Sequence, residues 1–156
     1  MSTATDALLF YGFLIPGGPD EGCPFWKRPH PEYPACADDT DETDSDEFIA
    51  AKYGLPQPAT PYSEAAKDEY IAYWNAKRAL LKPIGVEVET HCSGSYTMYA
   101  LAISASRSIA SRGDPIEFEA LPVADPTWNQ KLRDFCEKTG APFSAPRWIL
   151  ASWWDQ

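Results

Sequence analysis

His91 and Cys92 form the one place in the chain where an imidazole and a thiol are adjacent. An imidazole beside a thiol can accept its proton and so produce a nucleophile for covalent catalysis. The flanking residues alternate in a way that predicts a strand, and neighbouring residues on a strand point to opposite faces. We therefore expect His91 and Cys92 to meet only if the strand ends before them. No third residue that would orient the histidine can be assigned from the sequence.

A zinc site is the second kind of chemistry to consider. Its candidate ligands are Cys23, His30, Cys36, His91 and Cys92. Structural zinc ligands usually come in pairs two to four residues apart, whereas Cys23 and Cys36 are thirteen positions apart. The spacing matches no common zinc signature, so the sequence assigns no metal.

Acidic residues are concentrated immediately before the first predicted helix. Seven of the ten positions from 38 to 47 are acidic: Asp38, Asp39, Asp41, Glu42, Asp44, Asp46 and Glu47. The run lacks the glycine and the closing glutamate of an EF-hand loop, and such runs are usually solvated. Aromatic side chains often anchor protein interfaces, and Trp26 precedes the run. We predict that Trp26 and these acids form a binding surface.

Arg107 and Arg112 form a small basic island in an acidic chain. Arginine binds phosphates and carboxylates through paired hydrogen bonds, so both residues are candidate ligand contacts. The alternative is that they pair with nearby acids such as Asp114 or Glu117. The chain contains no Walker loop, dinucleotide fingerprint or nucleophile elbow, and we therefore expect no cofactor.

The charge of the chain limits its partners. It has 156 residues and a formal net charge of −10, which disfavours direct binding to nucleic acid or to anionic membranes. A partner protein with a basic surface fits better. No run of about 18 apolar residues predicts a membrane span, and the start lacks a signal peptide's positive charge. We therefore predict a cytoplasmic protein whose cysteines are reduced thiols.

The strands expected around these residues follow from apolar runs and alternation. Residues 7–15 predict a buried strand in which Gly12 marks a bulge or a close backbone approach. Residues 86–104 predict a hairpin with a turn at Ser93–Gly94, and Glu87 and Glu89 alternate with apolar residues so as to face solvent on its first strand. A strand at 147–154 and an edge strand at 116–119 complete the set.

Three helices are expected between the strands, each with start and stop signals. Asp44 or Ser45 caps a short helix that ends at Gly54. Ser63 caps a longer helix over 63–82 that carries an aromatic stripe, and Asp125–Pro126 starts a third that ends at Gly140.

The order of these elements predicts an α+β, or mixed α/β, fold. We expect a sheet of four to five strands with the hairpin at its centre and helices packed on one face. The chain is predicted to be a single domain, 1–156, that contains an irregular segment over 16–47, rich in proline and acids.

Several stretches also carry a resemblance to known proteins: Leu8-Leu9-Phe10-Tyr11-Gly12-Phe13, His91-Cys92-Ser93-Gly94-Ser95-Tyr96 and Trp153-Trp154. In these the chain resembles small hypothetical proteins encoded by bacteriophages, prophages and plasmids. The resemblance implies an origin in a mobile element, where small acidic proteins often inhibit or modulate host machinery, including defence or nucleic-acid-handling proteins. The expected function is thus non-enzymatic binding to a host protein by occlusion. The alternatives are a small enzyme that uses Cys92 and His91, and a virion-associated structural protein.

Overall fold

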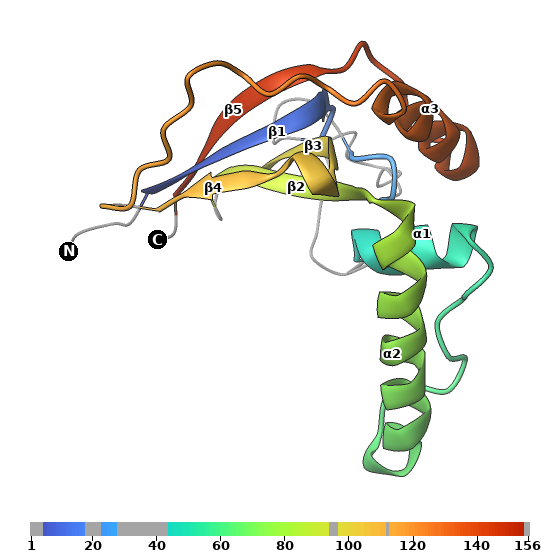
Figure 1. Ribbon diagram of the computed structural model, residues 1–156. Helices are drawn as coiled ribbons and strands as arrows, with labels where there is room; N and C mark the ends of the chain where they lie inside the picture. Colours follow the sequence, from blue (N-terminus) through green and yellow to red (C-terminus); the bar gives the residue numbers. More distant parts are fainter. Residues whose placement is uncertain (1–4, 18–22, 28–43, 94–96, 112, 155–156) are drawn as a thin grey trace.

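The computed structural model describes residues 5–17, 23–27, 44–93, 97–111 and 113–154, and the α+β class is confirmed there (Figure 1). The elements within these ranges are β1 (Thr5–Ile15), α1 (Ser45–Lys52), the 3-10 turn η1 (Glu64–Ala66), α2 (Lys67–Ile84), β2 (Val86–Ser93), β3 (Thr97–Ile103), the 3-10 turn η2 (Ser104–Ser106), β4 (Ser108–Ala110), α3 (Trp128–Thr139) and β5 (Arg147–Trp154). None of the described helices is both long enough and apolar enough to span a membrane.

The strands form one mixed sheet in the order β3-β2-β5-β1-β4. β1 pairs with β5 along most of its length, and on its other side with β4 at its start and β3 at its end. β2 and β5 meet in a short parallel pairing that begins at Cys92 and Trp153. Because β1 also reaches β3, the pairings run from β3 through β2, β5 and β1 back to β3. The predicted hairpin is present as β2–β3, but β1 has the most strand partners.

Gly12 lies where β1 passes closest to β3. It is paired with Ala102, and a Cβ atom added to Gly12 would overlap the carbonyl oxygen of Leu101 and lie 2.9 Å from its carbonyl carbon. The predicted close backbone approach is therefore confirmed. Any side chain here would push β1 away from β3.

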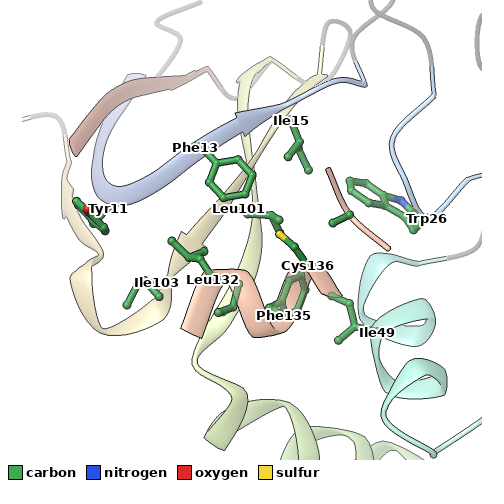
Figure 2. Close-up of a cluster of buried hydrophobic side chains, with 12 residues drawn as sticks. Tyr11, Phe13, Ile15, Trp26, Ile49, Leu101, Ile103, Leu132, Phe135 and Cys136 are labelled. Carbon is green, nitrogen blue, oxygen red and sulfur yellow. The ribbon is translucent and has the colours of Figure 1, made fainter. Parts of the chain in front are cut away.

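Both faces of β1 are buried, by different partners. Its odd-numbered residues from Tyr11 onward face a cluster formed with β3 and helices α1 and α3 (Figure 2). That cluster includes Phe13, Ile15, Trp26, Ile49, Leu101, Ile103, Leu132, Phe135 and Cys136. The opposite face forms a second cluster in which Leu8 and Phe10 contact Ala100 and Ala102, with Ile149 and Ala151 packed beside them. The strand is thus buried as its apolar run predicts.

The helix signals at Asp44 and Ser63 act where the sequence places them. Asp44 accepts a hydrogen bond from the Asp46 amide at 3.1 Å and caps α1, and Ser63 caps the short turn that leads into α2. α2 ends at Gly85, which has a φ of 66°.

The helix start expected at Asp125–Pro126 is early. α3 begins at Trp128 after Thr127, because Asp125 accepts hydrogen bonds from the Thr127 amide at 2.8 Å and hydroxyl at 2.7 Å in a turn before the helix. α1 and α3 pack on one face of the sheet, whereas α2 extends away from it (Figure 1).

The edge strand predicted over 116–119 is wrong. These residues lie in an irregular segment that runs along β5 toward α3 (Figure 1). Ile116 and Phe118 face the sheet and line a cavity above β1, while Glu117 and Glu119 are exposed. The alternation therefore reflects contact with the sheet surface, without backbone pairing.

Replacing Gly12 with alanine tests the close approach of β1 and β3. We expect the free energy of unfolding to fall by about 2 kcal/mol or more, because the methyl group overlaps backbone atoms that cannot rotate away. The urea midpoint of the variant measures this loss. Ser152→Ala, an equally small change at an exposed position of β5, is the control and should shift stability by less than about 0.5 kcal/mol. An unchanged midpoint for Gly12→Ala would contradict the geometry.

Candidate functional site

The main candidate site is an apolar groove on the sheet face that α3 leaves uncovered. α3 reaches as far as Trp148, whose ring lies 6.2 Å from that of Trp128 and 5.6 Å from that of Tyr11. Beyond this point the same face continues with the side chains of Ala7 and Leu9 on β1. These are paired with β4 on one side and with β5 on the other.

The groove has a floor of three strands and a roof of irregular chain. Its cavity measures about 490 Å³. The lining residues are Ala7, Leu9, Ser108, Ala110, Ile116, Phe118, Leu121, Trp148 and Leu150, and none of them is charged. Four of the large apolar side chains are at least two-fifths exposed: Ile116 at 44%, Phe118 at 45%, Leu121 at 57% and Leu150 at 73%.

Acidic residues occur in the irregular segment that covers this groove. Asp114, Glu117 and Glu119 are all exposed and lie within two positions of Ile116 or Phe118 in the chain. The apolar groove is therefore covered by a segment that is itself acidic. The sequence predicted no site here, although the alternation at 116–119 could have indicated that Ile116 and Phe118 share one face.

A second arrangement that the sequence did not predict is a buried carboxyl group on β2. Glu87 and Glu89 are two residues apart and were expected on a wet face, but Glu89 is only 6% exposed. It is paired in register with Ala100, on the face that packs against Leu8 and Phe10. The expectation of a solvated strand face is wrong at Glu89 because the sheet curves back on itself.

Arg107 is the partner of this carboxyl. Its Nε donates to Oε1 of Glu89 at 2.6 Å. Burial raises the pKa of Glu89 from 4.5 to about 7, with Arg107 opposing that rise and Glu87 adding to it. Arg107 thus pairs with an acid of its own chain, which is the alternative to a ligand contact, although that acid is Glu89 and neither Asp114 nor Glu117. Arg112 lies outside the described residues.

His91 and Cys92 both lie within β2, which continues to Ser93. Cys92 has a φ of 81°, a left-handed conformation that residues other than glycine rarely adopt. It occurs where β2 meets β5. Catalytic use of the pair stays a prediction.

The predicted acidic surface is partly engaged within the chain. Asp38, Asp39, Asp41 and Glu42 lie outside the described residues. Asp44 and Glu47 approach the Lys77 amine at 3.7 and 3.8 Å, which ties α1 to α2. Burial, followed by the charge of Asp44, raises the pKa of Asp46.

Trp26 was predicted to contact a partner, but it is only 6% exposed and belongs to the core. Its ring lies edge-on to Tyr99, 4.9 Å away, and to Phe25, 5.0 Å away. Trp26 therefore stabilises the fold.

The cysteines have different states. Cys92 and Cys136 are free thiols, whereas Cys23 is disulfide-bonded, so the expectation of reduced thiols throughout is wrong at Cys23. Within the described ranges, no group of three or more histidine, cysteine or acidic residues is placed to hold a metal ion. His30 and Cys36, two of the candidate zinc ligands, lie outside those ranges.

Comparison with known proteins adds no assignment: no family model, no curated protein and no solved structure matches the chain.

Glu89→Gln should change how stability depends on pH. A carboxyl whose pKa is raised by folding favours the folded state below pH 4.5, and this contribution is lost as the pH rises to about 7. Over that range the wild type should lose about 1–3 kcal/mol of stability relative to Glu89→Gln. Urea unfolding of both proteins across the range measures the difference. Glu119→Gln, an exposed control, should show no such trend, and a constant difference for Glu89→Gln would contradict the raised pKa.

Cys136 should resist alkylation in the folded protein. It lies on the buried face of α3, and burial raises its thiol pKa to about 11, so little reactive thiolate forms near pH 8. We expect native Cys136 to react about 100-fold more slowly with iodoacetamide than after unfolding in urea. Peptide mapping by mass spectrometry gives the rate at each cysteine separately. Equal rates in the two states would contradict this placement.

Proposed function

We propose that this chain is a non-enzymatic binding protein that occludes a partner's surface with the apolar groove. The observation that carries the proposal is the groove's cavity of about 490 Å³, lined by apolar side chains of β1, β5 and the segment over 116–121. Groups of exposed apolar side chains are uncommon on monomers and often mark interaction sites.

The chemistry of the groove supports a protein partner with a particular surface. Stable interfaces combine an apolar centre with polar surroundings, and the groove and its acidic covering segment offer both. Leu150 and Leu121 offer apolar area, while Asp114, Glu117 and Glu119 supply negative charge from the covering segment. A projecting apolar side chain flanked by lysine or arginine is therefore the complementary surface.

The net charge of −10 supports the same kind of partner. Long-range attraction between an acidic protein and a basic surface speeds encounter and weakens as salt is added. We take the partner to be a protein of a bacterial host, as the resemblance to mobile-element proteins implies. Inhibition would then follow from covering the partner's basic surface.

Leu150→Lys tests the groove directly. Leu150 is 73% exposed, so the variant should fold, but it places a positive charge among the apolar residues of the groove. We expect at least about a tenfold loss of affinity for a partner isolated from bacterial lysate and identified by mass spectrometry. Binding is measured by calorimetry or by surface plasmon resonance at several salt concentrations.

Val123→Lys is the matched control for this experiment. Val123 is 95% exposed in the same segment and does not line the groove, so the substitution adds the same charge outside the site. Affinity should be retained in this variant. If both variants bind equally well, or if binding is indifferent to salt, the proposed surface is wrong.

A further inference from the structure

Helix α2 is an arm attached to the body of the protein at one end. Its 18 residues span about 27 Å, and Gly85 joins its C-terminal end to β2. α1 packs beside the attached end, and the helix extends away from the sheet (Figure 1). At the outer end Tyr70 donates a hydrogen bond to the carbonyl of Thr60 at 3.0 Å, which holds the preceding segment along the arm.

Large apolar side chains are exposed on this arm. Ile71 is 42% exposed and Trp74 is 43% exposed, although both lie in the middle of the helix. Tyr62 is 55% exposed, and the centre of its ring lies 6.1 Å from that of Trp74 and 5.2 Å from that of Tyr70. A projecting helix that exposes these residues is typical of a surface that another helix covers.

A cavity of about 550 Å³ occupies the corner between the attached end of α2, α1 and the start of β2. Trp74 and Leu81 supply part of its apolar wall, and charged residues of both signs complete it: Lys77, Arg78 and Lys82 with Asp46 and Glu87. Lys77 is engaged by Asp44 and Glu47, whereas Arg78 and Lys82 are exposed. The corner is thus a partly apolar recess of mixed charge, with Arg78 and Lys82 as its exposed cations.

The charged residues of the arm are distributed unevenly between its two ends. Basic Arg78 lies five residues after Tyr73, and acidic Asp68 lies five residues before it. Lys82 lies nine residues after Tyr73, and Glu64, in the turn η1 before α2, lies nine residues before it. The Glu64 side chain is 82% exposed and pairs with Lys67 at 3.1 Å, which leaves Asp68 and Glu69 as the acids of the first turn of α2. The outer end of the arm therefore has an excess of acids and the attached end an excess of bases, with Ile71 and Trp74 between them.

We infer that α2 is the contact through which two copies of this chain associate, antiparallel and about a twofold axis near Tyr73. In this arrangement the outer end of each arm lies against the exposed cations at the corner of the other copy. Asp68 then faces Arg78, and Glu64 faces Lys82. Twofold symmetry makes every such pair twice, and Ile71 and Trp74 of both copies are buried at the centre.

A second copy accounts for these features better than an unrelated partner does. An antiparallel pair is favoured by opposite charges at equal distances on either side of its centre, and α2 with the turn before it has them at two spacings. The exposed cations at the corner and the acids at the outer end of the arm then face each other. The net charge of −10 on each chain opposes association and keeps the contact dependent on these local pairs.

The inference is independent of the proposed binding function. The corner cavity and the apolar groove share no lining residue, and the dimer contact does not use the segment over 116–121. A monomeric protein could still bind a partner through the groove, and a dimer could form without one.

Sedimentation equilibrium or light scattering over a concentration series tests the contact. The wild type should approach twice the mass of one chain as concentration rises. Asp68→Lys and Arg78→Asp should each weaken the dimer by about tenfold or more, because each places like charges opposite one another at two symmetric positions. Trp74→Ala should weaken it by removing the apolar centre.

The double variant Asp68→Lys/Arg78→Asp provides the decisive test. It restores opposite charges across the axis and leaves the net charge unchanged, so we expect dimerisation to return toward the wild-type level. Glu137→Lys, at an exposed position of α3, gives the same charge change as Asp68→Lys and should not affect the dimer. Circular dichroism checks that each variant is folded. A wild type that stays monomeric, or a double variant that is folded but not restored, would overturn the inference.

Discussion

The contact between β1 and β3 at Gly12 determines the shape of this protein. β1 exchanges hydrogen bonds with β5 on one edge and, on the other, with β4 and then β3. The last of these pairings requires the two backbones to come so close that no Cβ atom fits between them. Because β3 is also paired with β2, and β2 meets β5, this one contact makes the sheet curve back on itself.

The curvature decides which side chains are enclosed and which face is left bare. It buries Glu89, which occupies a normal outward position of an alternating strand, and brings Arg107 to it. On the other face, α1 and α3 cover the residues from Tyr11 to Ile15, and an irregular segment lies above the part of β1 before Tyr11. The groove is thus the part of the sheet face that none of the described helices covers.

Local signals in the sequence predicted most of the elements and little of their assembly. The strands at residues 7–15 and 147–154, the hairpin and the caps Asp44 and Ser63 depend on neighbouring residues, and each is confirmed. The burial of Glu89 and the groove depend on pairings between distant strands, and no periodicity encodes these. The groove's Leu9 and Leu150, for example, lie at opposite ends of the chain and become neighbours only through strand register.

The pairing of β1 with β5 also bears on how the protein is made. These strands are separated by most of the described chain, so β1 leaves the ribosome well before the strand with which it forms its longest pairing. Contacts between such distant segments form slowly because a long loop must close first. During synthesis the run from Leu8 to Ile15 therefore lacks its longest strand partner until β5 has been made. An unpaired apolar strand is prone to aggregate. The topology makes the nascent chain, more than the finished protein, the state that would benefit most from a chaperone.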